Sequence, residues 1–174
     1  MRTTLTRAAL CLCALSAHAE TVSMPAVANY LDAERIASNI RSECSLPQYQ
    51  ASAIQKTFSA AGITLSPSDA DAVPQQGIHL VPQIASAYSG GHAFLGHRKQ
   101  VQLMADLYVN GKKTATFNGT RNSMGGVMAG FSSSCDVLER CADSLSTDLL
   151  KWFRQQRITM SVPPIPAAEE PPAP

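Results

Sequence analysis

Residues 98–123, RKQVQLMADLYVNGKKTATFNGTRNS, contain the pattern that decides the fold. From Val101 to Val109 an apolar residue occupies every second position, and Gln102, Met104, Asp106 and Tyr108 lie between them. A period of two is typical of a β-strand with one face in the core. Asn110-Gly111 then marks a turn, and residues 112–123 form the returning strand. The stretch therefore predicts a hairpin with one apolar face.

The length of the turn decides which residues of the hairpin face each other. A two-residue loop, Asn110-Gly111, would set Leu103 opposite Asn118 and bring polar residues to the core face. A three-residue loop that includes the preceding valine sets Leu103 opposite Phe117 and leaves the glycine in the left-handed position of a type I turn with a bulge. Because a slip of one residue moves every side chain to the other face, the pattern favours the three-residue loop.

Two helices are predicted outside the hairpin. Pro47 suits the first turn of a helix over residues 47–61, and Gly62 suits the position just past its end. A second helix, residues 133–156, follows a run of serines that can act as N-caps. Its apolar side chains share one face at helical spacing: Leu138, Ala142, Leu145, Leu149 and Trp152.

The remaining segments complete the predicted sheet. Residues 77–88 are predicted as a strand, in which Pro82 indicates an edge position or a bulge, and residues 21–30 as an edge strand at best because of Pro25. Residues 66–77 are predicted as a connector. The predicted fold is α/β (α+β): a two-layer sandwich, with a mostly antiparallel sheet of about four strands and two helices on one face.

The two ends of the chain are predicted to lie outside this domain. Arg2 and Arg7, the apolar residues 8–16 and the small residues of Ala17-His18-Ala19 form a signal-peptide pattern, with cleavage after Ala19. The single domain is predicted over residues 20–157. Residues 158–174 are predicted as a disordered tail, because from Pro163 onward six of twelve residues are proline.

The charge and hydropathy of the mature chain limit the partners that it can have. Removal of residues 1–19 takes away two of the 14 basic residues and none of the 13 acidic ones, which leaves a net charge of −1. No block of like charge occurs, so we expect no nucleic-acid partner. No apolar run approaches the ~18 residues that a membrane span needs, and we expect a periplasmic or secreted protein without a transmembrane segment.

Three cysteines remain after export, and we expect one disulfide among them. Cys135 and Cys141 lie six residues apart on the last predicted helix, about 9 Å along its axis, whereas a disulfide needs Cα atoms within about 7 Å. Cys44 must therefore be one partner. Cys44 and Cys135 both lie at helix starts, so parallel neighbouring helices would bring them together. We predict a Cys44–Cys135 disulfide and a free thiol at Cys141, which could alternatively pair between chains.

Several stretches resemble a group of small exported proteobacterial proteins of unknown function, similar to the α/β domains of envelope lipoproteins. The matching elements are, in chain order, 40–46 (IRSECSL), 69–71 (DAD), the hairpin, the Gly-rich segment after it, 135–138 (CDVL) and 148–152 (DLLKW). The resemblance implies a cell-envelope location and a cystine that links the two helical segments. The chain departs from the lipoproteins because leucine, not a small residue, precedes Cys11 and Cys13.

Candidate sites for chemistry are few. His92 and His97 flank a Gly-rich turn, and they and Asp106 are the candidate ligands, with His79 nearby in sequence. A zinc site needs three or four ligands, usually with help from cysteine or carboxylate, and no carboxylate lies between Asp71 and Asp106. Residues 125–134, with three glycines and three serines, could hold an anion on backbone N–H groups, yet the lysine of a phosphate-binding loop is missing there. No catalytic residue, metal or cofactor is therefore assigned.

Two functions fit these observations. The first is a non-enzymatic binding or structural module of the cell envelope, which binds another envelope protein through an exposed face or edge of the sheet. The second is a small periplasmic ligand- or metal-binding protein or hydrolase that uses the His92/His97 turn. A concave pocket in which two of four residues converge would favour the second function: His79, His92, His97 and Asp106.

Overall fold

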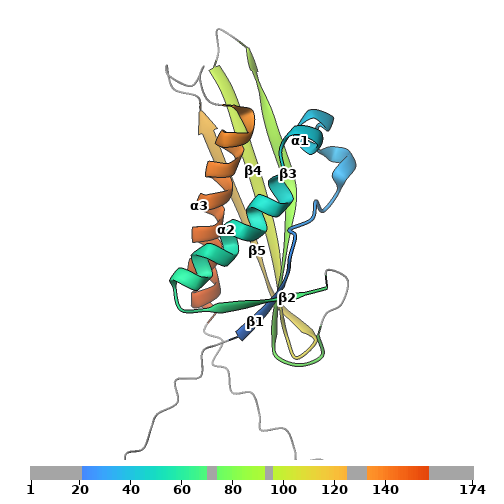
Figure 1. Ribbon diagram of the computed structural model, residues 1–174, viewed down its shortest axis with the longest axis vertical. Coiled ribbons are helices and arrows are strands. Elements are labelled where there is room, and N and C mark those ends of the chain that lie inside the picture. The colour runs from blue at the N-terminus through green and yellow to red at the C-terminus, as the bar shows by residue number, and fades with distance from the viewer. Residues whose placement is uncertain (1–20, 70–73, 93–95, 125–132, 157–174) are drawn as a thin grey trace, which may run out of the picture.

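The computed structural model describes residues 21–69, 74–92, 96–124 and 133–156, so the predicted signal peptide and the tail lie outside the described residues. The chain forms a five-stranded sheet and a layer of helices (Figure 1). The elements in chain order are β1 (Thr21–Pro25), the 3-10 helix η1 (Ala33–Arg35), α1 (Ser38–Glu43), α2 (Leu46–Ala60), β2 (Thr64–Ser68), β3 (Ile78–His92), β4 (Gly96–Val109), β5 (Lys112–Met124) and α3 (Ser134–Gln155).

The sheet has the order β2-β1-β3-β4-β5, and it is mixed. β1 pairs in parallel with both β2 and β3, whereas β3, β4 and β5 pair antiparallel. This corrects two expectations from sequence. The α+β class is right, but the sheet has five strands rather than about four, because β2 forms at the start of the predicted connector. β1 lies inside the sheet rather than at its edge, and Pro25 is accommodated as its last residue.

The hairpin between β4 and β5 corrects the predicted turn. Val109 pairs with Lys112, so the loop has two residues, and both have positive φ, 50° at Asn110 and 75° at Gly111. The register then shifts between Leu107 and Tyr108, so that Thr114 is the extra residue of a bulge in β5. The shift sets Ala105 opposite Phe117, so the apolar side chains still share the core face, through a bulge in the strand rather than a longer loop.

The two long helices begin and end within a residue or two of the sequence predictions. In α2 Pro47 lies in the first turn, and Gly62 follows with a φ of 80°. At α3, Ser133 Oγ accepts the Asp136 N–H at 3.1 Å and the Asp136 carboxylate accepts the Ser133 N–H at 3.1 Å. This capping box satisfies two donors at the helix start.

Helices α2 and α3 run side by side in the same direction (Figure 1). The disulfide joins their amino-terminal ends, and the rings of Phe58 and Phe153 lie 5.4 Å apart near their carboxyl-terminal ends. Between these points the fully buried Gln50 donates to Ser146 Oγ at 2.9 Å. The pair therefore covers one face of the sheet as a single layer.

Candidate functional site

The two faces of the sheet have different surroundings. On β4 the core-facing side chains Val101, Leu103, Ala105 and Leu107 are 0% exposed. The alternate positions point away from the helices, and their side chains are partly exposed. Figure 1 shows α2 and α3 on one side of the strands, with no described helix on the other. We call this second side the open face; it consists of the outward side chains of β3, β4 and β5.

Polar side chains connect the strands across the open face. Ser86 on β3 donates to Gln102 Oε1 on β4 at 3.4 Å, and Gln102 Nε2 donates to Asn118 Oδ1 on β5 at 3.0 Å. Each of these amides keeps further donors and acceptors. The centre of the open face is therefore uncharged, ordered by hydrogen bonds, and able to form more of them.

Asp106, a candidate ligand from sequence, is engaged within the open face. Its carboxylate contacts Lys113 Nζ at 2.7 Å and accepts the Thr116 hydroxyl at 2.8 Å. The hydrogen bond to Asp106 raises the pKa of the exposed Lys113. These contacts are typical of a polar sheet surface. Asp106 pairs with Lys113 and Thr116, and it belongs to no cluster of candidate ligands in the described residues.

The histidine candidates do not converge with Asp106. His92 pairs with Gly96 and His97 with Gly91 at the far end of the β3–β4 hairpin, and their side chains lie outside the described residues. His97 and Asp106 are nine residues apart on one strand, about 30 Å at ~3.3 Å per residue. In the described parts of the chain no three His, Cys, Asp or Glu residues lie close enough to hold a metal ion.

His79 is the buried histidine of the open face, at 1% exposure. Its Nδ1 lies 2.8 Å from Ser23 Oγ, and the Ser23 hydroxyl donates to the Ile78 carbonyl at 3.1 Å. Because that hydroxyl has one hydrogen, Nδ1–H of His79 is the donor in the first contact. Nε2 is buried and has no hydrogen-bond partner among the described residues, and burial lowers the pKa of His79. The fold therefore holds His79 in its neutral form.

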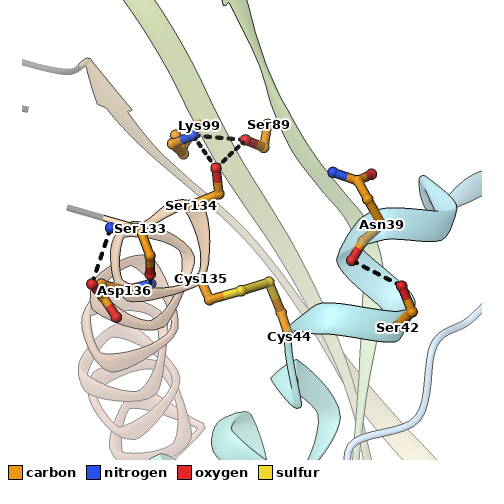
Figure 2. Close-up of a disulfide and its surroundings, with 9 residues drawn as sticks. All are labelled: Asn39, Ser42, Cys44, Ser89, Lys99, Ser133, Ser134, Cys135 and Asp136. Atoms are coloured by element: carbon orange, nitrogen blue, oxygen red, sulfur yellow. Dashed lines mark hydrogen bonds between the residues drawn. A yellow bond between two sulfur atoms is a disulfide. The ribbon is translucent and has the colours of Figure 1, made fainter. Parts of the chain in front are cut away.

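The cysteines lie on the opposite, helix-covered side. Cys44, just after α1, and Cys135, in the first turn of α3, form a disulfide with their Cα atoms 5.3 Å apart (Figure 2). This is the pair that the helix geometry predicts. Cys141 is a free, buried cysteine, and burial raises the pKa of its thiol. A protonated, enclosed thiol is a poor nucleophile, so the structure does not support Cys141 as a catalytic nucleophile.

Sequence reasoning missed one polar cluster next to the disulfide. Lys99 continues the core-facing series of β4 and is only 9% exposed. Its Nζ lies 2.7 Å from Ser89 Oγ on β3 and 2.7 Å from Ser134 Oγ on α3 (Figure 2). The available signal was the alternation itself, which places a charged side chain at position 99 on the same face as Val101 and Leu103.

A groove of about 540 Å³ runs along the solvent side of the helix layer, between α2 and α3. Tyr49 donates to Asp143 Oδ2 at 3.1 Å across it, and Lys56 and Thr147 also line it. Burial and the contact with Asp143 raise the pKa of Tyr49. Most side chains that line the groove are small or polar. Its ionisable groups contact one another or face the solvent.

Comparison with known proteins shows the fold but no family. No protein-family model and no curated protein sequence matches the chain. A solved structure from Xanthomonas campestris, assigned to DUF330, is 10% identical, covers 79% of this chain and 86% of its own, and has a TM-score of 0.56. A minor lipoprotein from Acinetobacter baumannii is 9% identical, with 80% and 95% coverage and a TM-score of 0.49.

A third similar structure is the PelC dodecamer from Paraburkholderia phytofirmans, which is 12% identical, covers 74% of this chain and 86% of its own, and has a TM-score of 0.46. The chain thus has an α+β fold that also occurs in the Xanthomonas campestris protein. Lipoproteins are among the similar structures, as the resemblance in sequence predicted. Of the helices that the structure describes, none is both long and apolar enough to span a membrane.

Proposed function

We propose that this chain is an exported protein of the cell envelope, and that it is a non-enzymatic module which binds another envelope protein through the open face of its sheet. The signal-peptide pattern of residues 1–19 supports export. The stretches that resemble small exported envelope proteins, among them residues 40–46, 135–138 and 148–152, support an envelope location.

One observation carries the binding role: both long helices lie on one side of the sheet (Figure 1), and on the other side the outward side chains of β3, β4 and β5, apart from His79, are partly or fully exposed in the described residues. Amides and hydroxyls occupy its centre, and Tyr88 is 55% exposed at one end. Tyrosine supplies apolar contact area together with a hydroxyl, and it is enriched where proteins meet. The centre of the face around Gln102 is uncharged and forms hydrogen bonds, which suits a partner that is itself uncharged at that contact.

Photo-crosslinking in the native cell tests this role. A photoreactive phenylalanine in place of Gln102 lies at the centre of the open face, and the same residue in place of Asn118 lies on the neighbouring strand. Gln55, exposed on α2, is the matched control on the opposite side of the molecule. We expect the same crosslinked protein from positions 102 and 118 and no such adduct from position 55.

A charge substitution gives the second measurement. Gln102→Arg places an unpaired cation on the neutral face and is expected to abolish the crosslink from position 118, while Gln55→Arg leaves it intact. Absence of an adduct from the open face, or equal adducts from both sides, would contradict the proposal. Circular dichroism of the two arginine variants establishes that the fold is unchanged.

A further inference from the structure

Lys99, Ser89 and Ser134 form a closed triangle of polar groups on the helix-covered side of the sheet (Figure 2). Lys99 Nζ donates to both serine hydroxyls at 2.7 Å, and the two hydroxyl oxygens lie 3.1 Å apart. The three residues come from β4, β3 and α3, so the tertiary fold assembles the triangle. The disulfide at Cys135 ties the adjoining turn of α3 to Cys44.

The positive charge of Lys99 has no carboxylate partner in the described residues. The two ion pairs there use Lys113 and Arg121. Asp136, the acidic residue nearest to Ser134 in sequence, accepts the Ser133 N–H in the capping box. Residues 91–97 and 125–132, which flank the triangle in sequence, contain no Asp or Glu. Buried charges in proteins are normally paired, and Lys99, nine-tenths buried, is not.

The triangle also keeps donors that its own contacts do not use. An ammonium has three hydrogens and Lys99 spends two on the serines. One serine hydroxyl donates to the other, which leaves the second hydroxyl hydrogen without a use. In the first turn of α3, Ser133 engages the N–H groups of Asp136 and Val137, so the amides of Ser134 and Cys135 remain outside the cap. Hydrogen-bond donors that have no acceptor, next to a buried positive charge, favour the binding of an anion.

We infer that Lys99, Ser89 and Ser134 bind an oxoanion of the phosphate class, carried by a free phosphate ion or by a phospholipid headgroup. Lys99 supplies the opposite charge, a serine hydroxyl and the first amides of α3 donate hydrogen bonds, and the amino-terminal end of the helix adds its partial positive charge. Residues 125–134 contain no lysine. The fold places Lys99 of β4 next to Ser134.

Thermal unfolding of the oxidised protein tests the site, with inorganic phosphate as the probe and chloride added to keep the ionic strength constant. Phosphate is expected to raise the unfolding midpoint of the wild type, since a ligand that binds the native state stabilises it. Lys99→Met keeps the length of the side chain without its charge, and we expect the apparent affinity for phosphate to fall by about tenfold or more. Ser134→Ala is expected to weaken binding in the same direction.

Lys56→Met is the matched control, because Lys56 is exposed on α2 and away from the triangle; it should keep the wild-type response. An equal response of wild type and Lys99→Met, or a midpoint that phosphate raises no more than chloride does, would overturn the inference. Co-sedimentation with phosphatidylglycerol vesicles, compared with phosphatidylcholine vesicles, separates the two sources. If sedimentation with phosphatidylglycerol vesicles depends on Lys99, the ligand is the phospholipid headgroup. If phosphate raises the unfolding midpoint but the vesicles do not sediment the protein, the ligand is the free phosphate ion.

Discussion

The two faces of β4 lie in different surroundings. Leu103 and Leu107 face the helices and are fully buried. Gln102 and Asp106 alternate with them, face outward and bond to side chains of the neighbouring strands. One run of fourteen residues thus contributes to the core and to a polar surface at once. A single position in sequence thus separates a side chain of the core from one of the polar surface.

The helix-covered side also contains the disulfide and two polar contacts of the interior. The disulfide, Lys99 and the polar bridge from Gln50 to Ser146 are all located between the sheet and the helices or between the two helices. On the open face the polar groups bond to one another at the surface. We therefore expect substitutions on the helix-covered side to change folding, and substitutions on the open face to change binding.

Loss of the disulfide should have the largest effect on the helix-covered side. The bond closes a loop with a sequence separation of 91, which is worth about 4–5 kcal/mol in the chain-entropy model. We expect Cys44→Ser and Cys135→Ser to lower the free energy of unfolding by about this amount, as measured by urea titration. Cys141→Ser is the matched control and should be mild. A large loss with Cys141→Ser, or linkage of Cys44 to Cys141 in non-reducing peptide mapping, would contradict the assignment.

A pair of neighbouring substitutions compares the two faces directly. Leu103→Ala removes a fully buried side chain and should cost about 2–5 kcal/mol of unfolding free energy. Gln102→Ala, one residue away on the open face, should change it by no more than about 0.5 kcal/mol. Denaturant titration of the two variants measures the difference. Similar losses in both would show that the open face is part of the folding core.

His79 is the exception on the open face, since it is buried there, and it predicts a pH dependence. Burial lowers its pKa in the folded state below the unfolded value of about 6.5. Its contribution to stability is therefore fully present above that unfolded value and is lost as the pH falls through the lower folded value. Urea titrations between neutral and acidic pH should show a decline that is smaller in His79→Gln. An identical pH dependence in both would contradict the buried, neutral histidine.

Deletion of residues 158–174 should have the smallest effect. If the proline-rich segment is disordered, its loss leaves the unfolding midpoint nearly unchanged in a thermal scan. A decrease of many degrees would show that the segment packs on the domain. The packed domain would then extend beyond the described residues, and the comparison of the two faces would need revision.

Sequence reasoning succeeded where the pattern is local. The serine cap and apolar stripe of α3, the Pro47 and Gly62 limits of α2, and the alternation of β4 each depend on residues a few positions apart. It failed where the decision depends on partners. β2 is short and contains Pro67, and it becomes a strand because β1 lies beside it. The bulge at Thr114 forms because Phe117 must reach the core across from Ala105.

The sequence by itself determined the elements of the hairpin and of the two long helices, together with the reason that Cys141 cannot bond to Cys135 along one helix. Propensity, capping and periodicity act within a few residues, so they can be read without a fold. Only the tertiary structure decided the parallel pairing of β1 with β2 and β3, the distance between His97 and Asp106, and the contact of Lys99 with Ser134. These depend on segments far apart in the chain, whose packing minimises exposed apolar surface for the whole domain at once.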